Sequence, residues 1–300
     1  MRFDYPLLEA LAAVVREGTF EAAARTLNIT QSAVSQRVKL LEEKTGAVLI
    51  RRGRPCVPTE QGMKLYRHID QVQLLEHELE KAVLGLDESR RSLPVSIRMA
   101  VNADSLAIWF AEVVARAGQK LRISFDIVPD DQEHTASRLR SGEALAAVTA
   151  EAEPVQGCRR ISLGSMEYVA VASPRFVQAR LPDGIDFEAV LAAPVVFFDR
   201  KDMLQEQWLL AAFGRTGVMR CHYVPSFQGY LSACLLGCGW GLVPRPTVDD
   251  YLRAGTLVDL TPGFAVPVAL YWQASVRESE VMRDLAAIVV DVAKKYLRGS

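Results

Sequence analysis

Apolar residues near the start of the chain predict two short helices separated by a tight turn. In the first helix they recur every three or four positions, at Phe20, Ala23, Ala24 and Leu27. Asn28-Ile29 interrupts this repeat, and a second repeat follows at Val34, Val38 and Leu41. Thr19 and Thr30 precede the two repeats, where a threonine hydroxyl can cap a helix. The pattern is typical of a helix-turn-helix, and an apolar repeat over 5–16 predicts a helix that supports it.

The second predicted helix carries a polar face opposite its apolar face. Its members have side chains that form hydrogen bonds: Gln31, Ser32, Ser35, Gln36 and Lys39. Because these positions are neighbours at helical spacing, they form one surface. Side chains of this kind match the edges of bases in a major groove. We therefore expect this face to contact double-stranded DNA.

A short basic segment follows the second helix. The residues over 46–52 predict a turn and a short strand, and those over 54–57 predict the returning strand. The tip of this wing carries Arg51, Arg52 and Arg54. Beside a helix-turn-helix, such a wing would place its arginines against phosphates or the minor groove. The alternative is a solvated run of charge. With the wing, the expected winged helix-turn-helix domain spans 1–58.

A long helix is predicted over 59–88. It carries a seam of apolar residues at steps of three and four, with Glu76 as the one interruption: Leu65, Ile69, Val72, Leu79, Val83 and Leu86. A single helix cannot bury such a seam alone, so a partner helix is expected, and a homodimer is the economical choice. Two heads on a two-fold axis could then address adjacent major grooves. The alternative is that the helix packs on its own C-terminal domain.

The rest of the chain alternates predicted strands, loops and helices. Strands are expected over 95–101, 123–128, 144–149, 168–172, 194–198, 221–224 and 269–272, and a terminal helix over 281–297. This order predicts an α/β domain over 89–300 with a largely parallel sheet. We expect two lobes, one of about 93–164 with 270–300 and the other of about 165–269. The whole chain is then an α+β multidomain protein, and ligands are expected beside loops that follow strands.

Composition limits the function. The formal net charge is −1, which excludes a uniformly basic nucleic-acid binder and makes any DNA contact local. The start is too short and too acidic for a signal peptide, and no apolar run is long enough for a membrane span, so we expect a cytoplasmic protein. The five cysteines lack metal-ligand spacing, so we expect no metal site, and Cys234 and Cys238 are expected to be small core residues rather than a redox pair.

Several sequence segments together resemble a LysR-type transcriptional regulator over essentially the whole chain. They are AAARTLNITQSAVSQRVKLLEEKTG, PTEQG at 58–62, the long helix and the two-lobed domain. Within the family the chain is most similar to the lysine- and arginine-responsive ArgP/LysG branch. The segments that carry this closer resemblance are ITQSAVSQRVKLLE, PTEQG, AVNADSLA at 100–107, PVVFFD at 194–199 and DLTPG at 259–263.

The resemblance implies a fold, a function and partners. The C-terminal part would have a periplasmic-binding-protein-like fold that holds a small effector between its lobes, and the chain would not be an enzyme. It implies a dimer and a tetramer built as a dimer of dimers, with RNA polymerase as a candidate partner. The effector would be L-lysine or L-arginine, and a target gene would encode an amino-acid exporter. The matching DNA contacts are Gln31, Ser32, Ser35, Gln36 and Arg52.

The matching positions of the effector cleft are Asn102, Ser105, Gln132, Asp199 and Ser226. A basic amino acid presents one carboxylate and two cations. Ser105, expected at a helix start, suits the carboxylate. The acids Asp104, Asp131, Asp199 and Asp202 lie in loops and suit the cations, with Asp199 the first choice for the distant one. For any single residue, the alternative is a simple helix cap.

Three other functions compete with this interpretation. The first is a regulator with an aromatic or aliphatic acid as effector, or with no effector. An anionic ligand without an ammonium would favour arginines in the cleft loops, whereas these loops are rich in acids. An α/β enzyme lacks support, because no GxSxG, Walker or HExxH motif occurs. A solute-binding protein would need a secretory signal and would leave the helix-turn-helix unexplained.

Overall fold

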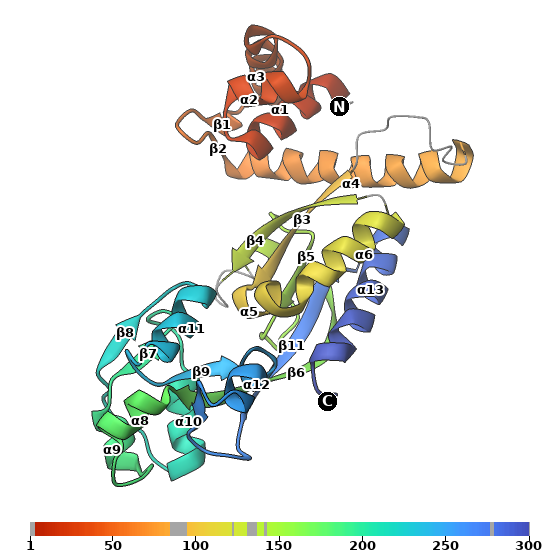
Figure 1. Cartoon of the computed structure of the whole chain (residues 1–300). Helices are drawn as coiled ribbons and strands as arrows, with labels where there is room; N and C mark the ends of the chain where they lie inside the picture. Colours follow the sequence, from red (N-terminus) through yellow and green to blue (C-terminus); the bar gives the residue numbers. More distant parts are fainter. Residues whose placement is uncertain are drawn as a thin grey trace.

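The computed structural model describes residues 4–84, 95–121, 123–130, 137–140, 143–276 and 279–299. A small helical unit stands at one end of the molecule, a long helix crosses beneath it, and a two-lobed domain lies beyond that helix (Figure 1). Along the chain, the helical unit comes first, the long helix second and the two-lobed domain last. None of the described helices is long and apolar enough to cross a membrane.

The N-terminal unit contains the predicted helix-turn-helix. Its helices are α1 (Tyr5–Glu17), α2 (Phe20–Thr26) and α3 (Gln31–Thr45). The Thr19 hydroxyl accepts a hydrogen bond from Ala22 N at 3.1 Å, and the Thr30 hydroxyl accepts one from Ala33 N at 3.2 Å. Asn28, in the turn, has a φ of 52°, a conformation that asparagine tolerates better than most residues. Both predicted caps are therefore confirmed.

A two-stranded wing follows α3. Strands β1 (Ile50–Arg51) and β2 (Val57–Pro58) pair in antiparallel fashion. The carboxylate of Glu42 on α3 accepts hydrogen bonds from Leu49 N at 2.8 Å and Ile50 N at 3.3 Å. These bonds fix the wing against the helix that precedes it.

The long helix α4 (Glu60–Leu84) packs against both parts of its own chain. Leu65, Ile69 and Val72 belong to the core of the N-terminal unit, whereas Leu74 joins the core of the C-terminal domain. The predicted seam is therefore divided, because three of its six residues, Leu65, Ile69 and Val72, pack within the N-terminal unit of the same chain. Leu79 is 61 % exposed, as is the neighbouring Leu75 at 58 %. The Val83 side chain and Leu86 lie outside the described residues.

A seven-stranded sheet runs through both lobes, in the order β10-β6-β11-β5-β3-β4, with β9 also on β6. Its strands are β3 (Val95–Asn102), β4 (Ile123–Asp130), β5 (Ala146–Thr149), β6 (Cys158–Ala172), β9 (Gly241–Pro244), β10 (Val258–Asp259) and β11 (Val266–Ser275). Only β3, β4 and β5 pair in parallel within it, so the prediction of a largely parallel sheet is wrong. The reason is that β6 leads into the second lobe and β11 returns from it, so these paired strands run in opposite directions.

Helices cover the sheet in both lobes. In the first lobe, β3 leads into α5 (Ala103–Ser105), a π-helical turn η1 (Leu106–Phe110) and α6 (Ala111–Leu121), and α6 packs beside α13 (Glu280–Tyr296) (Figure 1). The second lobe contains α8 (Pro174–Arg180), α9 (Phe187–Ala192), β7 (Val195–Phe197), α10 (Leu204–Phe213), β8 (Cys221–Tyr223), α11 (Phe227–Leu235) and α12 (Arg245–Arg253). Strands β7 and β8 pair in parallel.

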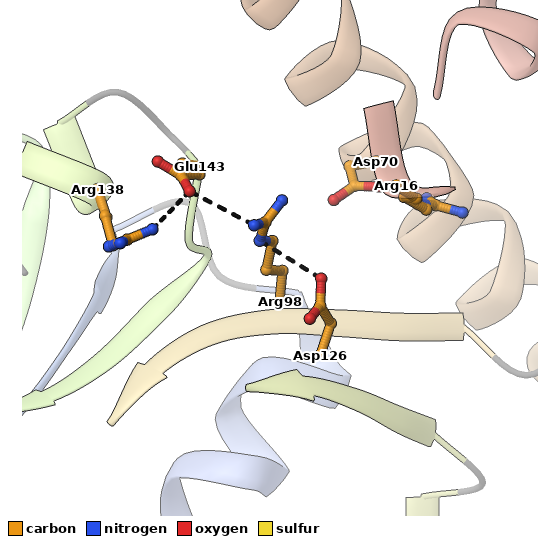
Figure 2. A network of polar contacts seen from close by, with 6 residues as sticks. All are labelled: Arg16, Asp70, Arg98, Asp126, Arg138 and Glu143. Carbon is orange, nitrogen blue, oxygen red and sulfur yellow. Dashed lines mark hydrogen bonds and ion pairs between the residues drawn. The ribbon is translucent and has the colours of Figure 1, made fainter. Parts of the chain in front are cut away.

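Charged side chains gather where α4 passes the first lobe. Asp70 on α4 is 7 % exposed and forms an ion pair with Arg16 on α1. Burial raises the pKa of Asp70, while Arg16 and the more distant Arg98 act in the opposite direction. Arg98 on β3 pairs with Asp126 and Glu143, both at 3.4 Å. Glu143 also pairs with Arg138 at 2.6 Å, and Figure 2 shows this group beside Arg16 and Asp70.

The cysteines are only partly core residues. Cys56 and Cys234 are buried, whereas Cys238 is exposed. The expectation that Cys234 and Cys238 are both buried is therefore wrong for Cys238, which follows the end of α11. Among the described residues, no cluster of three or more His, Cys, Asp or Glu is arranged to hold a metal ion.

Gly62, in the first turn of α4, touches the wing so closely that a larger residue cannot fit. A Cβ atom at Gly62 would lie 2.1 Å from the carbonyl oxygen of Leu49. We expect Gly62→Ala to destabilise the protein by about 1–3 kcal/mol, because α4 or the wing must move. Thermal and urea unfolding of the full chain measure this change.

Gly118→Ala in α6 is the matched control. A Cβ there would have ordinary contacts, with the nearest atom, Ile123 O, at 3.7 Å. Alanine should stabilise that helix by about 0.5–1 kcal/mol. Equal stability of Gly62→Ala and the wild type would show that α4 and the wing are not locked together at this contact.

Candidate functional site

The outer face of α3 presents the predicted polar residues together. Gln31, Ser32, Gln36 and Lys39 are exposed and Ser35 is half-buried. The apolar residues Val34 and Val38, at 0 % and 1 % exposure, hold the opposite face against the core. Thr30 and Ser32 share a hydrogen bond at 3.0 Å, and Lys39 pairs with Glu43 at 3.7 Å. The helix thus offers donors and acceptors on one surface while its other surface is fixed.

The wing places three exposed arginines beside this helix, at Arg51, Arg52 and Arg54. Arg52 is the best oriented of them. Its guanidinium carbon lies 5.2 Å from the ring centroid of Phe20, and its Nη2 donates to Ser35 Oγ at 3.4 Å. Arg52 therefore links the wing, α2 and α3. Phe20 was identified from the sequence only as an apolar helix position, so its contact with Arg52 is a result of the tertiary structure.

A cleft of about 570 Å³ lies between the two lobes. Four predicted residues line it: Asn102 and Asp104 from the first lobe, and Asp199 and Asp202 from the second. Sequence reasoning missed several of its other lining residues, among them Tyr168, Phe198, Lys201, Phe227, Tyr230 and Tyr271. Among the described residues, the charged lining groups are three carboxylates and one ammonium, a formal charge of −2. Such a cleft complements a cationic ligand.

The other predicted residues lie elsewhere. Ser105 is fully buried and is not among the residues that line the cleft. It lies in the first turn of the helical run that begins at Ala103 with Asn102 as its N-cap residue, so its expected place at a helix start is confirmed. Ser226 is exposed and caps α11 by accepting a hydrogen bond from Gly229 N at 3.3 Å. Asp131 and Gln132 lie outside the described residues.

Asp202 and Asp199, the two cleft carboxylates of the second lobe, differ in how many of their oxygens accept hydrogen bonds. The carboxylate of Asp202 accepts bonds from Phe198 N and Leu204 N, both at 3.1 Å, and from the Gln205 side chain at 3.2 Å. It therefore holds the loop between β7 and α10 in place. Asp199 uses Oδ1 for Lys201 N at 2.7 Å and Asp202 N at 3.0 Å. Within the described chain, its Oδ2 accepts no hydrogen bond.

The first-lobe end of the cleft is rich in acceptors. Asp104 accepts a hydrogen bond from the hydroxyl of Tyr168, which reaches it from β6. Burial raises the pKa of Asp104, the Tyr168 hydrogen bond lowers it, and the charge of Asp202 raises it. The buried Oδ1 of Asn102 has no hydrogen-bond partner among the described residues. Asn102 also forms no side-chain cap on the helical run that starts at Ala103.

The missed tyrosines had no distinctive signal in the sequence. Tyr168 and Tyr271 lie on the long strands β6 and β11, where aromatic residues are typical of a sheet core. Only the pairing of these strands across both lobes brings the two rings to the cleft.

Comparison with known proteins follows the same two-part division. A model of "Bacterial regulatory helix-turn-helix protein, lysR family" matches residues 6–63, and a model of the "LysR substrate binding domain" matches residues 91–294. The HTH-type transcriptional regulator ArgP of Pseudomonas fluorescens is 43 % identical over 270 residues, which cover 90 % of this chain and 90 % of that protein.

Two solved structures extend the similarity over the whole chain. The crystal structure of ArgP from Mycobacterium tuberculosis is 39 % identical, with a TM-score of 0.79 and coverage of 100 % of both chains. Full-length LysG from Corynebacterium glutamicum, with the effector arginine bound, is 35 % identical, with a TM-score of 0.68 and coverage of 99 % of this chain and 100 % of that one. The helix-turn-helix, the two-lobed domain and these matches together show that the chain belongs to the LysR family of bacterial transcriptional regulators.

Proposed function

We propose that the chain is a LysR-type regulator that recognises operator DNA and takes a basic amino acid, L-arginine or L-lysine, as its effector. The observation that carries the choice of effector is the formal charge of −2 on the described lining of the cleft. An anionic effector would bring a further negative charge to three carboxylates and one ammonium. The arginine bound to the similar LysG supports the same choice.

The two lobes divide the recognition of the effector in this proposal. The first-turn N–H groups of the helical run from Ala103, which no side chain caps, hold the α-carboxylate. Asp104 accepts the α-ammonium beside it. Asp199 takes the distant cation, because its Oδ2 is available and it lies on the opposite lobe. Ser105, Gln132 and Ser226 are supported by resemblance, and Asp131 by its expected place in an acidic loop after a strand.

Binding that joins the lobes would favour one arrangement of them over another. Leu74 of α4 packs into the core of the first lobe, and Arg98 of that lobe lies near Asp70 of α4. A changed arrangement would therefore act on α4 and on the spacing of the DNA-binding units. The exposed Leu75 and Leu79 favour a dimer through α4. A tetramer, contact with RNA polymerase and control of an exporter gene follow from the family resemblance.

The proposed domain limits are 1–58, 59–88 and 89–300, with lobes of 93–164 plus 270–300 and of 165–269. An irregularity in the strands supports the lobe limits. The β6–β11 pairing shifts register between Leu270 and Tyr271, opposite Gly164, whose φ is 108°. The two strands thus depart from regular pairing where the chain passes between the lobes.

On the DNA, we assign base contacts to Gln31, Ser32, Ser35, Gln36 and Lys39, and phosphate contacts to Arg51, Arg52 and Arg54. The exposed polar face of α3 suits base edges, while guanidinium groups on the wing suit phosphates. Arg52 is held in advance by Phe20 and Ser35, so it loses little freedom on binding.

Asp199→Asn tests the effector site. We expect the affinity for L-arginine and L-lysine to fall about tenfold to hundredfold, because a charge-assisted hydrogen bond is lost. Norleucine, which lacks the distant cation, should bind the variant and the wild type equally weakly. Isothermal titration calorimetry measures each affinity.

Asp183→Asn, at an exposed turn of the second lobe, is the matched control and should bind as the wild type does. Unchanged binding by Asp199→Asn would remove Asp199 from the site.

Gln36→Ala and Arg52→Ala test the division of DNA contacts. Gln36→Ala should lose about 1–3 kcal/mol of discrimination at one base pair, with its salt dependence unchanged. Arg52→Ala should weaken binding to all sequences and reduce the salt slope by about 1. Fluorescence anisotropy on DNA selected by the wild type, and on random DNA, at several salt concentrations measures both effects. Equal loss of specific and non-specific binding in both variants would contradict the assignment.

A further inference from the structure

The hydroxyl of Tyr168 reaches Asp104 from a strand that serves the other lobe. Tyr168 lies on the second half of β6, where it faces Val266 of β11 and Pro244 of β9. Its side chain is 4 % exposed and its hydroxyl donates to Asp104 Oδ2. Asp104 lies in the first turn after β3, at the first-lobe end of the cleft. The bond therefore connects the crossing strand to a residue proposed to bind the effector.

The surroundings of Asp104 oppose its ionisation. Asp202 faces it from the loop between β7 and α10, and Asp199 and Lys201 line the same cleft. Tyr230 on α11 contributes a second buried phenol to the cleft lining. Burial raises the pKa of Asp104, and the charge of Asp202 raises it further. Among the described residues, the Tyr168 hydroxyl is the one hydrogen-bond donor to the Asp104 side chain, and it lowers that pKa.

Tyr168 itself is a donor at all ordinary pH values. Burial raises its pKa well above the usual value for tyrosine, and the charge of Asp104 adds to this effect. The phenol therefore keeps its proton and offers it to the carboxylate. Because it occupies Oδ2, the other oxygen of Asp104 is left to face a ligand.

We propose that Tyr168 is a positioning residue of the effector site, which holds Asp104 as an oriented carboxylate for the α-ammonium group of an amino acid. This inference rests on the proposed function and deepens it. A protonated Asp104 would attract a cation far less than a carboxylate does. Tyr168 thereby makes the cleft selective for ligands that carry an ammonium beside their carboxylate.

The proposal has a consequence for pH. Affinity for an α-ammonium is present above the pKa of Asp104 and is lost as the pH falls through it. Removal of the phenol raises that pKa, so the loss begins at a higher pH. A purely structural role for Tyr168 would lower affinity at every pH and leave the midpoint unchanged.

Calorimetric titration of the full chain with L-arginine between pH 5 and 8.5 tests this inference. For Tyr168→Phe we expect the midpoint of the affinity profile to move up by about 1–2 pH units relative to the wild type. Asp104→Asn should bind weakly with no such midpoint. Tyr271→Phe removes the hydroxyl of another tyrosine that lines the cleft, for which no hydrogen bond to Asp104 is found among the described residues, and should keep the wild-type midpoint.

A second ligand and a second variant complete the test. 5-Guanidinopentanoate, which is arginine without its α-ammonium, should not lose affinity as the pH falls through the Asp104 pKa, either with Tyr168→Phe or with the wild type. If Tyr168→Phe does not fold, 3-fluorotyrosine at position 168, a stronger donor of similar shape, should move the midpoint for arginine to lower pH. An unchanged midpoint for the folded Tyr168 variant overturns this inference but leaves the proposed function standing. Failure of the wild type to bind arginine and lysine overturns the proposed function itself.

Discussion

The antiparallel pairing of β6 and β11 determines the geometry of the C-terminal domain. Both strands belong to both lobes, and ten pairs of residues align them from Val266–Tyr168 to Ser275–Cys158. Because the chain leaves the first lobe on one strand and returns on its neighbour, the two lobes share a continuous sheet. The loops after β3 and β7 are thereby brought to opposite sides of one cleft. Every proposed contact with an effector depends on this double crossing.

The cleft concentrates negative charge at some cost to the unliganded protein. Asp104, Asp199 and Asp202 lie around one space, and the solvation that Asp104 loses by burial is only partly replaced. The carboxylate of Asp202 accepts hydrogen bonds from backbone N–H groups, and that of Asp104 accepts one from the phenol of Tyr168. One oxygen of Asp199 accepts no hydrogen bond from the part of the chain that the structure describes. A cationic ligand supplies what these groups lack, so affinity and selectivity share one electrostatic origin.

The N-terminal unit is joined to the rest of the chain by close packing rather than by a free tether alone. Gly62 lets α4 begin directly against the wing, and Ile69 continues the same core. Further along α4, Leu74 packs into the first lobe. A single helix is therefore shared by the DNA-binding unit and the ligand-binding domain, while its exposed leucines remain available to another chain.

The sequence by itself determined the local structure. Thr19, Thr30 and the apolar repeats specify the helices of the N-terminal unit, because caps and helical periodicity act over a few residues. The polar face of α3 followed from the same helical periodicity, and Asp104, Asp199 and Asp202 followed from their places in loops, whereas Asn102 was identified through the family resemblance. The direction of β6 and β11, the role of Tyr168 and the contact of Phe20 with Arg52 were decided only by the tertiary structure. These three features depend on contacts between residues far apart in the chain. The pattern of apolar residues in a strand indicates which side chains are buried, but not which other strand pairs with it.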